Sequence, residues 1–405
     1  MIPRNGSGPS IDLGAGIDAV EDQCDQIGEG CLVKTRAAVL HGRNEQFKVQ
    51  EVDLDPPAQH EVRVRLAATG LCHSDYHLVT GDLPMPYPVI GGHEGAGVVE
   101  EVGAEVTAVE PGDHVVLSFI PACGHCRSCA AGHSNLCDLG ANILAGPQLD
   151  GSYRFHVGAQ GAGQMCLLGT FAEHTVVPDV SVVKIDKSVP LRTAALIGCG
   201  VPTGYGAAVN KAKVRPGESV VVWGAGGIGM NAIQGAATSG ARVVVAVEPE
   251  EAKRKLAYEV FGATHVVDPN AVDPVDAVLE ATWNRGADVS IATPGVLTEA
   301  ILAQALRALG KAGRAVLVAV PPADAGHLPI TPFDVVMFER QILGTVYGSC
   351  NPFSDIPQLI DLYQSGKLKL DELVTNTYSL DQINDGYEAM LAGQNIRGLV
   401  ILSDD

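Results

Sequence analysis

Residues 219–248 read SVVVWGAGGIGMNAIQGAATSGARVVVAVE, and this stretch decides the fold of the C-terminal half of the chain. It begins with a continuous apolar run, passes through a glycine-rich turn into a segment of small residues, and ends in a second apolar run. Short apolar runs of this kind indicate strands that are buried on both faces, and the segment between them has the length of a helix. The stretch therefore predicts a strand–helix–strand unit of a parallel sheet.

The glycine-rich turn matches the pattern G-x-G-x-x-G and has the context that a dinucleotide-binding turn requires. Gly224 permits the tight turn, Gly226 and Gly227 let the backbone approach a pyrophosphate, and Gly229 lets helix and strand pack closely. Glu248 ends the second strand, where a carboxylate accepts hydrogen bonds from ribose hydroxyls and repels a 2′-phosphate. We therefore expect NAD rather than NADP; the alternative is a glycine-rich junction that binds nothing.

The rest of the chain divides into regions that differ in their expected order of strands and helices. Residues 34–185 consist of short strands separated by glycine and proline turns, whereas residues 190–345 alternate strands and helices. After residue 347, two helical stretches precede a last strand, RGLVILS. The pattern predicts an α/β protein with a Rossmann doubly wound parallel sheet beside a mainly β domain. Residues 1–33 are acidic and glycine-rich without a sustained period, so we expect a poorly ordered tail without a catalytic role.

Composition and charge exclude several classes of function. The chain has 405 residues, enough for two or three domains, and a net charge of −20. Such an acidic protein is a poor binder of nucleic acids and anionic membranes, and its apolar runs are far shorter than a membrane span. No secretory signal pattern opens the sequence, so we expect the reducing cytoplasm, where clustered cysteines bind metal more often than they form disulfides.

Four of the ten cysteines lie in one short polar segment: Cys123, Cys126, Cys129 and Cys137. Four thiolates at this spacing can surround one tetrahedral Zn²⁺ and leave no position open for chemistry, which predicts a structural zinc. Two disulfides and an iron–sulfur cluster are the alternatives. The expected compartment disfavours disulfides, and the long last gap without a Cys-Pro pair disfavours the cluster.

Three other potential metal ligands, Cys72, His93 and Cys199, are scattered along the chain. Each has an ordinary explanation on its own, because a buried cysteine packs as a small hydrophobic residue and a histidine beside glycine is often a satisfied turn residue. No spacing rule joins the three positions, so residue types and spacing alone leave a metal site here open.

The motifs GLCHSD, GGHEGAGVVEEVG, PGDHVV, GCGVPTGYGAA and IRGLVIL occur in this order around the cysteine loop and the glycine turn. With them the chain resembles, over about residues 34–403, the zinc-dependent alcohol dehydrogenases of the medium-chain dehydrogenase/reductase superfamily. The resemblance implies a GroES-like catalytic domain at 34–200, an NAD-binding Rossmann domain at 201–346, and a return to the catalytic domain at 347–405. It also implies oxidation of alcohols to aldehydes, and the reverse, with NAD and two Zn²⁺ per chain.

The resemblance also assigns roles to individual residues. It implies that Cys72, His93 and Cys199 bind a catalytic Zn²⁺, with Glu94 behind the metal or as a transient ligand and Asp75 orienting His93. The remaining implied roles are a proton relay through Ser74 and His77, nicotinamide packing by Thr203 and Ile228, pyrophosphate contacts from His73 and Arg397, an adenosine ribose contact from Lys253, and substrate-channel walls at Leu83 and Phe119.

Motifs such as GLCHSD, GS-x-RFH, MC-x-LGTF and LKLDELVT also resemble those of the bacterial nicotinoprotein alcohol dehydrogenases, which keep NAD bound and recycle it with a second substrate. The long 138–198 segment is typical of dimers, and the apolar segments at 315–321 and 340–347 could extend a sheet across a two-fold axis, so we expect a homodimer. Ala141 and Leu83 disfavour the glutathione-dependent formaldehyde dehydrogenases. A formaldehyde dismutase remains an alternative; the Cys/His/Cys set disfavours a zinc-free quinone reductase and a non-enzymatic binding protein.

Overall fold

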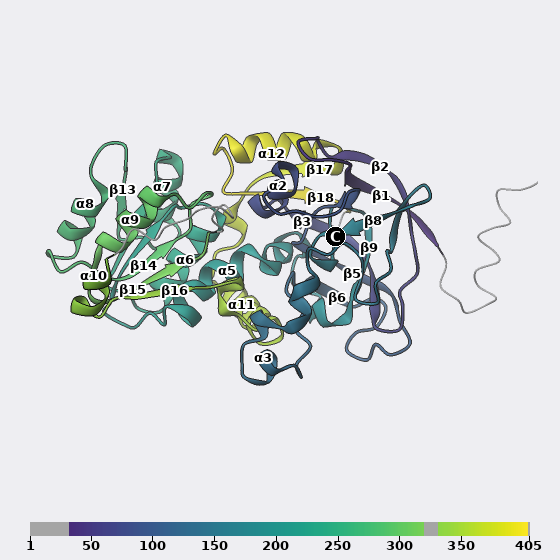
Figure 1. The fold of residues 1–405 in the computed structure, drawn as a ribbon, viewed down its shortest axis with the longest axis horizontal. Coiled ribbons are helices and arrows are strands. Elements are labelled where there is room, and N and C mark those ends of the chain that lie inside the picture. The colour runs from purple at the N-terminus through teal and green to yellow at the C-terminus, as the bar shows by residue number, and fades with distance from the viewer. Residues whose placement is uncertain (1–31, 320–330, 404–405) are drawn as a thin grey trace, which may run out of the picture.

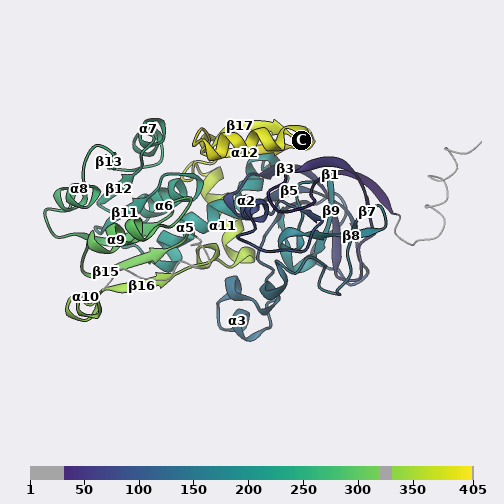
Figure 2. The same cartoon turned by 45° about the horizontal axis from the view of Figure 1, so that its top comes forward.

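The computed structural model describes residues 32–319 and 331–403, which form two lobes (Figure 1). The expected tail at 1–33 lies outside the described residues, apart from its last two positions. Helix α5 (Gly200–Gly206) lies between the lobes in both views (Figures 1 and 2). None of the helices in the described part of the chain is both long and apolar enough to span a bilayer.

One lobe is built on a six-stranded parallel sheet in the order β13-β12-β11-β14-β15-β16. Counted from the first strand, this is the order 3-2-1-4-5-6 of a Rossmann sheet, so the predicted fold class is confirmed. Its strands are β11 (Ser219–Trp223), β12 (Val243–Val247), β13 (His265–Val267), β14 (Ala287–Ala292), β15 (Leu309–Leu317) and β16 (Gln341–Gly344). Its helices are α6 (Gly227–Thr238), α7 (Glu251–Glu259), α8 (Pro274–Ala281), α9 (Glu299–Arg307) and α10 (Pro332–Phe338).

The stretch at 219–248 folds as its pattern predicts. Every residue of β11 and β12 is buried, and the two strands pair in parallel from Ser219 opposite Val243 onward. Helix α6 begins directly after the glycine turn and buries eight of its residues, four of which are glycine or alanine. Small side chains let the helix lie close to the sheet, and this brings the first turn of α6 to the carboxyl ends of the strands, where ligands bind in such folds.

The other lobe holds a closed five-stranded barrel, β1-β2-β7-β8-β4, and a second sheet, β10-β6-β5-β3-β18-β17, with β9 also paired to β3. The strands are β1 (Val33–Leu40), β2 (Lys48–Leu54), β3 (Glu61–Gly70), β4 (Val89–Ile90), β5 (Gly95–Val102), β6 (His114–Leu117), β7 (Phe155–Val157), β8 (Gln160–Gln164), β9 (His174–Pro178), β10 (Val182–Ile185), β17 (Val374–Ser379) and β18 (Arg397–Ile401). The helices are α2 (His73–Thr80), α3 (Arg127–Ala130), α4 (Leu191–Ala194), α11 (Pro352–Gln364) and α12 (Ile383–Leu391).

The C-terminal segment completes this second sheet. Strand β18 pairs antiparallel with β3, with Leu399 opposite Gly70, and β17 lies outside it (Figures 1 and 2). The pairing carries the end of the chain back to the strand that leads into the GLCHSD motif. The end of the chain therefore lies next to the segment that carries Cys72.

One expectation about the sheet edge is corrected in part. Of the two segments expected to suit pairing across a two-fold axis, 315–321 and 340–347, the first begins in β15, whose residues 315–317 are already paired on both sides, with β14 and β16. Among the described strands, the free edge on this side of the sheet is β16. An inner strand has no unpaired backbone N–H and C=O groups left for another chain.

Candidate active site

Four buried side chains from three separate segments converge between the lobes. Cys72 precedes α2, His93 and Glu94 lie between β4 and β5, and Cys199 precedes α5. One ligand atom from each lies within 4.8 Å of the others, and every one of these residues is at most 6% exposed. The tertiary structure thus brings together the scattered residues that no spacing rule could join.

The chemistry of this cluster fits a soft divalent cation such as Zn²⁺. A hydrogen bond from Cys199 lowers the pKa of Cys72 well below that of an ordinary thiol, whereas the hydrogen bond to Cys72, together with burial, raises the pKa of Cys199. Two sulfurs that share a proton deep in the protein, beside an imidazole, form a Cys₂His donor set that leaves a fourth position open. Oε1 of Glu94 is buried without a hydrogen-bond partner among the described residues.

Asp75 sets the orientation of His93. Nδ1 of His93 lies 3.0 Å from Oδ1 of Asp75, which also accepts a hydrogen bond from the backbone N–H of Gly92 at 2.8 Å. Because a carboxylate only accepts, Nδ1 carries a proton, and Nε2 is the ring nitrogen that a metal would bind in place of a proton. Burial alone would lower the pKa of His93, but the charge and the hydrogen bond of Asp75 raise it well above the ordinary value.

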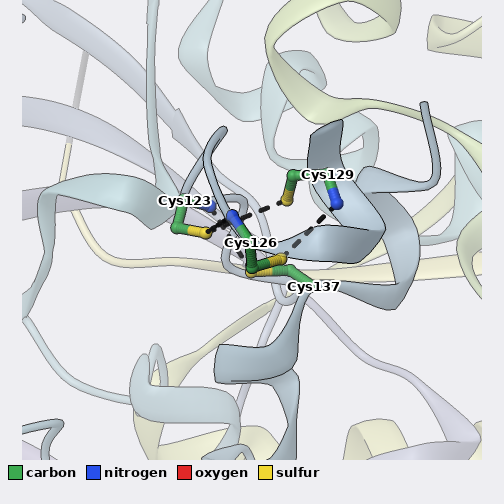
Figure 3. Close-up of side chains that lie close together, drawn as sticks. All are labelled: Cys123, Cys126, Cys129 and Cys137. Atoms are coloured by element: carbon green, nitrogen blue, oxygen red, sulfur yellow. Dashed lines mark hydrogen bonds between the residues drawn. The ribbon is translucent and has the colours of Figure 1, made fainter. Parts of the chain in front are cut away.

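The four clustered cysteines surround a second space, which Figure 3 shows. Sγ of Cys123 lies 4.0 Å from Sγ of Cys129, and Sγ of Cys126 lies 4.0 Å from Sγ of Cys137. These separations are far beyond a disulfide bond, and all eight cysteines in the described part of the chain are free. A tetrahedron with Zn–S bonds of about 2.3 Å has edges of about 3.8 Å, so the four sulfurs fit zinc.

Backbone N–H groups donate hydrogen bonds to the sulfurs of this loop. The N–H of Cys126 donates to Sγ of Cys123, and the N–H of Cys129 donates to Sγ of Cys126, at 3.3 and 3.4 Å. Hydrogen bonds from the backbone at Asp138 and Cys129 lower the pKa of Cys126 to about 6, so this sulfur is already ionised at neutral pH. Such donors hold the loop in a shape that accepts the metal.

The glycine turn has the shape of a phosphate cradle. Gly224 has φ of +90°, which favours glycine, and a Cβ at Gly229 would collide with the carbonyl oxygen of Gly224. A Cβ at Gly226, by contrast, would have no atom within 4 Å, so the space in front of the first turn of α6 is open. Open space at a helix N-terminus fits the pyrophosphate of a dinucleotide.

Glu248 is buried at the end of β12 and holds the glycine turn. Its Oε2 accepts a hydrogen bond from the N–H of Ala225 at 2.7 Å, and its Oε1 accepts one from the N–H of Glu250 at 3.1 Å. The carboxylate therefore braces the backbone of the turn, a contact that the sequence did not indicate. Its expected contact with a ribose stays a prediction.

Arg397 joins the glycine turn to the buried metal-ligand cluster. Its guanidinium forms an ion pair with Glu94, and a Cβ at Gly227 would collide with its side chain. A Cβ at Gly200, next to Cys199, would lie 3.2 Å from its Nη1. The expected pyrophosphate contact is untested, but the charge lies beside the open cradle.

Comparison with known proteins decides the family. Residues 58–187 match the family model described as alcohol dehydrogenase GroES-like domain, and residues 227–365 match the model described as zinc-binding dehydrogenase. The NDMA-dependent alcohol dehydrogenase of Amycolatopsis methanolica is 48% identical over 92% of this chain and 100% of its own length. The chain belongs to the zinc-binding alcohol dehydrogenases.

Solved structures of zinc-binding alcohol dehydrogenases agree with this assignment. A zinc-binding-domain alcohol dehydrogenase from Burkholderia ambifaria superposes with a TM-score of 0.88 at 34% identity. The benzyl alcohol dehydrogenase of Acinetobacter calcoaceticus superposes with a TM-score of 0.86 at 33% identity. Each match covers 92% of this chain and 100% of the other.

In this alcohol dehydrogenase the two expected relay residues lie on α2. Oγ of Ser74 is 3.7 Å from Sγ of Cys72, so the hydroxyl lies at the metal-ligand cluster. His77, one helical turn later, has its Nδ1 3.2 Å from a carboxylate oxygen of Asp82, which is half exposed. Ser74 and His77 are both partly exposed, and the proton relay through them stays a prediction.

The expected cofactor contacts lie around the space between the lobes. Burial lowers the pKa of His73, and a Cβ at Gly295, which follows β14, would lie 3.4 Å from its ring. Thr203 is buried on α5, and its Oγ1 has no hydrogen-bond partner among the described residues. The backbone of Ile228 packs against α5 at Gly204, and Lys253 lies on α7 near Gly393.

Phe119 stands next to the metal-ligand cluster, whereas Leu83 has no described contact with it. The ring of Phe119 meets His93 edge-on, with centroids 5.6 Å apart. On its other side, Phe119 meets Tyr347 edge-on at 5.0 Å. The sequence did not single out Tyr347, although an aromatic residue in the glycine-rich segment after β16 was a signal. Leu83 follows α2 and is half buried in the core of the barrel lobe.

Proposed function

We propose that this alcohol dehydrogenase oxidises an alcohol to an aldehyde, and catalyses the reverse, by hydride transfer between the alcohol carbon and NAD. The observation that carries the proposal is the position of Arg397, which packs against the dinucleotide turn while it pairs with Glu94 in the Cys72–His93–Cys199 cluster. A dinucleotide with its pyrophosphate at the glycine turn could thus bring its nicotinamide near an alcohol oxygen at the donor set.

The proposed reaction uses two cofactors, and different residues serve the metal and the transfer of the proton. Cys72, His93 and Cys199 would hold Zn²⁺, which would supply a Lewis acid that lowers the pKa of an alcohol hydroxyl, and NAD would supply the hydride acceptor. Ser74 would accept the proton of the alcohol as it releases its own, and His77 would carry a proton on to solvent. Asp75 keeps His93 in the tautomer that presents Nε2 to the cluster. A second zinc on the four-cysteine loop shapes that segment and takes no part in the chemistry.

We further propose NAD as the dinucleotide, because Glu248 is a buried carboxylate at the end of β12 and would repel a 2′-phosphate. The similarity to the NDMA-dependent enzyme supports tight retention of NAD and its recycling by a second substrate. The free cysteines in the described part of the chain support a reducing, cytoplasmic location.

A homodimer that pairs through the edge of β16 is also proposed. Helix α10, just before this strand, exposes Phe333, Val336 and Met337, which are between 59% and 71% exposed. Large apolar side chains beside an unpaired strand edge favour association with a second copy. Light scattering is expected to give about 84 kDa, twice the 42.1 kDa chain; a monomer or a tetramer would refute the dimer.

One experiment tests the activity and the retention of cofactor together. The purified protein, without added NAD, is mixed with benzyl alcohol, and absorbance near 340 nm is followed. A rise equivalent to the enzyme concentration supports both proposals, whereas a rise only after NAD is added supports the dehydrogenase and refutes retention. No reduction of NAD by any of a panel of primary and aromatic alcohols would refute the dehydrogenase.

A further inference from the structure

Asp75 uses only one of its two carboxylate oxygens. Oδ1 receives the N–H of Gly92 and faces Nδ1 of His93, but Oδ2 has no hydrogen-bond partner among the described residues. The residue is fully buried. A buried carboxylate oxygen without a donor is costly, so this atom calls for a hydrogen-bond donor.

Tyr387 on α12 carries a buried hydroxyl donor that lacks an acceptor among the described residues. It is 4% exposed, and its hydroxyl has no hydrogen-bond partner in the described part of the chain. Its ring stacks on Phe47 at 5.7 Å between centroids, meets Phe171 edge-on at 6.2 Å and lies 5.9 Å from Tyr76. The hydroxyl oxygen itself is buried.

Shared neighbours place the two unpartnered atoms in the same part of the structure. Phe47 and Phe171 both pack against Gly91, where a Cβ would lie 2.9 Å from either ring, and Gly92 is the residue that donates to Asp75. Tyr76 follows Asp75 directly in α2. Burial raises the pKa of the Tyr387 phenol well above its ordinary value, and the negative charge of Asp75 adds to the rise. The phenol therefore stays protonated and remains a donor.

We propose that Tyr387 is a positioning residue for the metal centre: its hydroxyl donates to Oδ2 of Asp75, which in turn holds His93. The inference rests on the proposed zinc function of Cys72, His93 and Cys199. With both oxygens engaged, the carboxylate of Asp75 cannot rotate, and the imidazole keeps its direction. Helix α12, from the C-terminal segment, thereby sets the geometry of a site whose ligands all lie in the first half of the chain.

The test is Tyr387→Phe, which removes the hydroxyl and keeps the ring among its aromatic neighbours. Zinc content per chain is measured after equilibrium dialysis against a graded chelator, and the visible spectrum is recorded after Co²⁺ replaces the more readily lost zinc. We expect about tenfold weaker binding of that zinc, the lower end of the range for partners behind the ligands, and a shifted Co²⁺ spectrum. The four-cysteine zinc should be unaffected.

Tyr363→Phe is the matched control, because the hydroxyl of Tyr363 donates to Asp371 at 2.9 Å, another tyrosine–carboxylate bond on α11. It should leave both zincs and the Co²⁺ spectrum unchanged. A double-mutant cycle with Asp75→Asn tests the route: if Tyr387 acts through Asp75, the double variant should lose no more zinc affinity than Asp75→Asn alone.

The outcomes separate the inference from the proposed function. If the unaltered protein binds only the four-cysteine zinc, the proposed function fails. If it binds two zincs and Tyr387→Phe holds both within twofold of normal with an unchanged Co²⁺ spectrum, the positioning role is refuted. Additive losses in the double variant would also refute it, because they would show that Tyr387 acts independently of Asp75.

Discussion

The guanidinium of Arg397 forms an ion pair with the carboxylate of Glu94, although 303 positions separate the two residues in the chain. Both are buried, at 6% and 0% exposure. Burial raises the pKa of Glu94 to about 7, while the positive charge of Arg397 opposes the rise. The pair thus ties the last strand of the chain to the segment that carries His93.

Arg397→Gln is expected to destabilise the protein strongly. Removing one partner of a buried pair leaves the other charge without compensation, which costs about 3–5 kcal/mol of unfolding free energy. Urea unfolding of the zinc-loaded protein measures the loss. Arg36→Gln is the matched control, since Arg36 pairs with Asp381 at 2.7 Å on the surface and its loss should cost less than about 1 kcal/mol. Equal losses in the two variants would contradict the prediction.

Cys72→Ala and Cys126→Ala should each remove one zinc, with opposite consequences. We expect Cys72→Ala to stay folded with about one zinc per chain and to lose turnover, because the four-cysteine loop is separate from the cluster. Cys126→Ala should lose stability first, because that metal holds a loop together. These predictions are checked by metal analysis, melting temperature and turnover, each measured on both variants. Two zincs retained by Cys72→Ala would show that the ligand assignment is wrong.

Substitutions of Glu248 should separate its charge from its hydrogen bond to Ala225. Glu248→Gln keeps an acceptor for the N–H of Ala225 and removes the charge, so discrimination against NADP should fall while the turn stays intact. Glu248→Ala removes both and should weaken binding of either dinucleotide. The measurement is the ratio of kcat/KM for NAD to that for NADP, on protein freed of bound cofactor. It shows whether the charge of Glu248 causes the discrimination against NADP. An unchanged ratio in Glu248→Gln would exclude charge as the cause.

The loop before β7 should contribute an acid-sensitive part of the stability. Burial alone would raise the pKa of Asp150, but hydrogen bonds from Ser152 and Arg154 outweigh it and lower the pKa to about 2. Because the folded-state pKa lies below the ordinary 3.8, the stabilisation is complete above that pH and declines as the pH falls toward 2.

Asp150→Asn should therefore be less stable than the unaltered protein at pH 6, by no more than about 1 kcal/mol because the side chain is half exposed. The difference should narrow as the pH falls below 3.8. Unfolding free energies measured across this range check the sign. A gap that widens toward low pH would contradict the assignment of the pKa shift.

Sites made of neighbouring residues could be predicted from the sequence. The glycine turn lies between two apolar strands within 30 residues, and the four cysteines lie within 15, so their spacing already places the ligands near one another. The exposed strands were harder: β17 has no fully buried residue, and β2 has only two. Without a buried apolar face, a strand carries little of the alternation that reveals it.

The sequence by itself determined the Rossmann unit and the four-cysteine loop, because a local pattern dictates both. The motifs that the chain shares with its family named Cys72, His93 and Cys199, but their approach to within 4.8 Å depends on how the strands around them pair. The second role of Glu248, the Arg397–Glu94 pair and the burial of Tyr387 among the rings near Gly91 were decided only by the tertiary structure. They join residues far apart in the chain, and such contacts exist only after the lobes have packed, because burial is what makes an unpaired charge or hydroxyl require a partner.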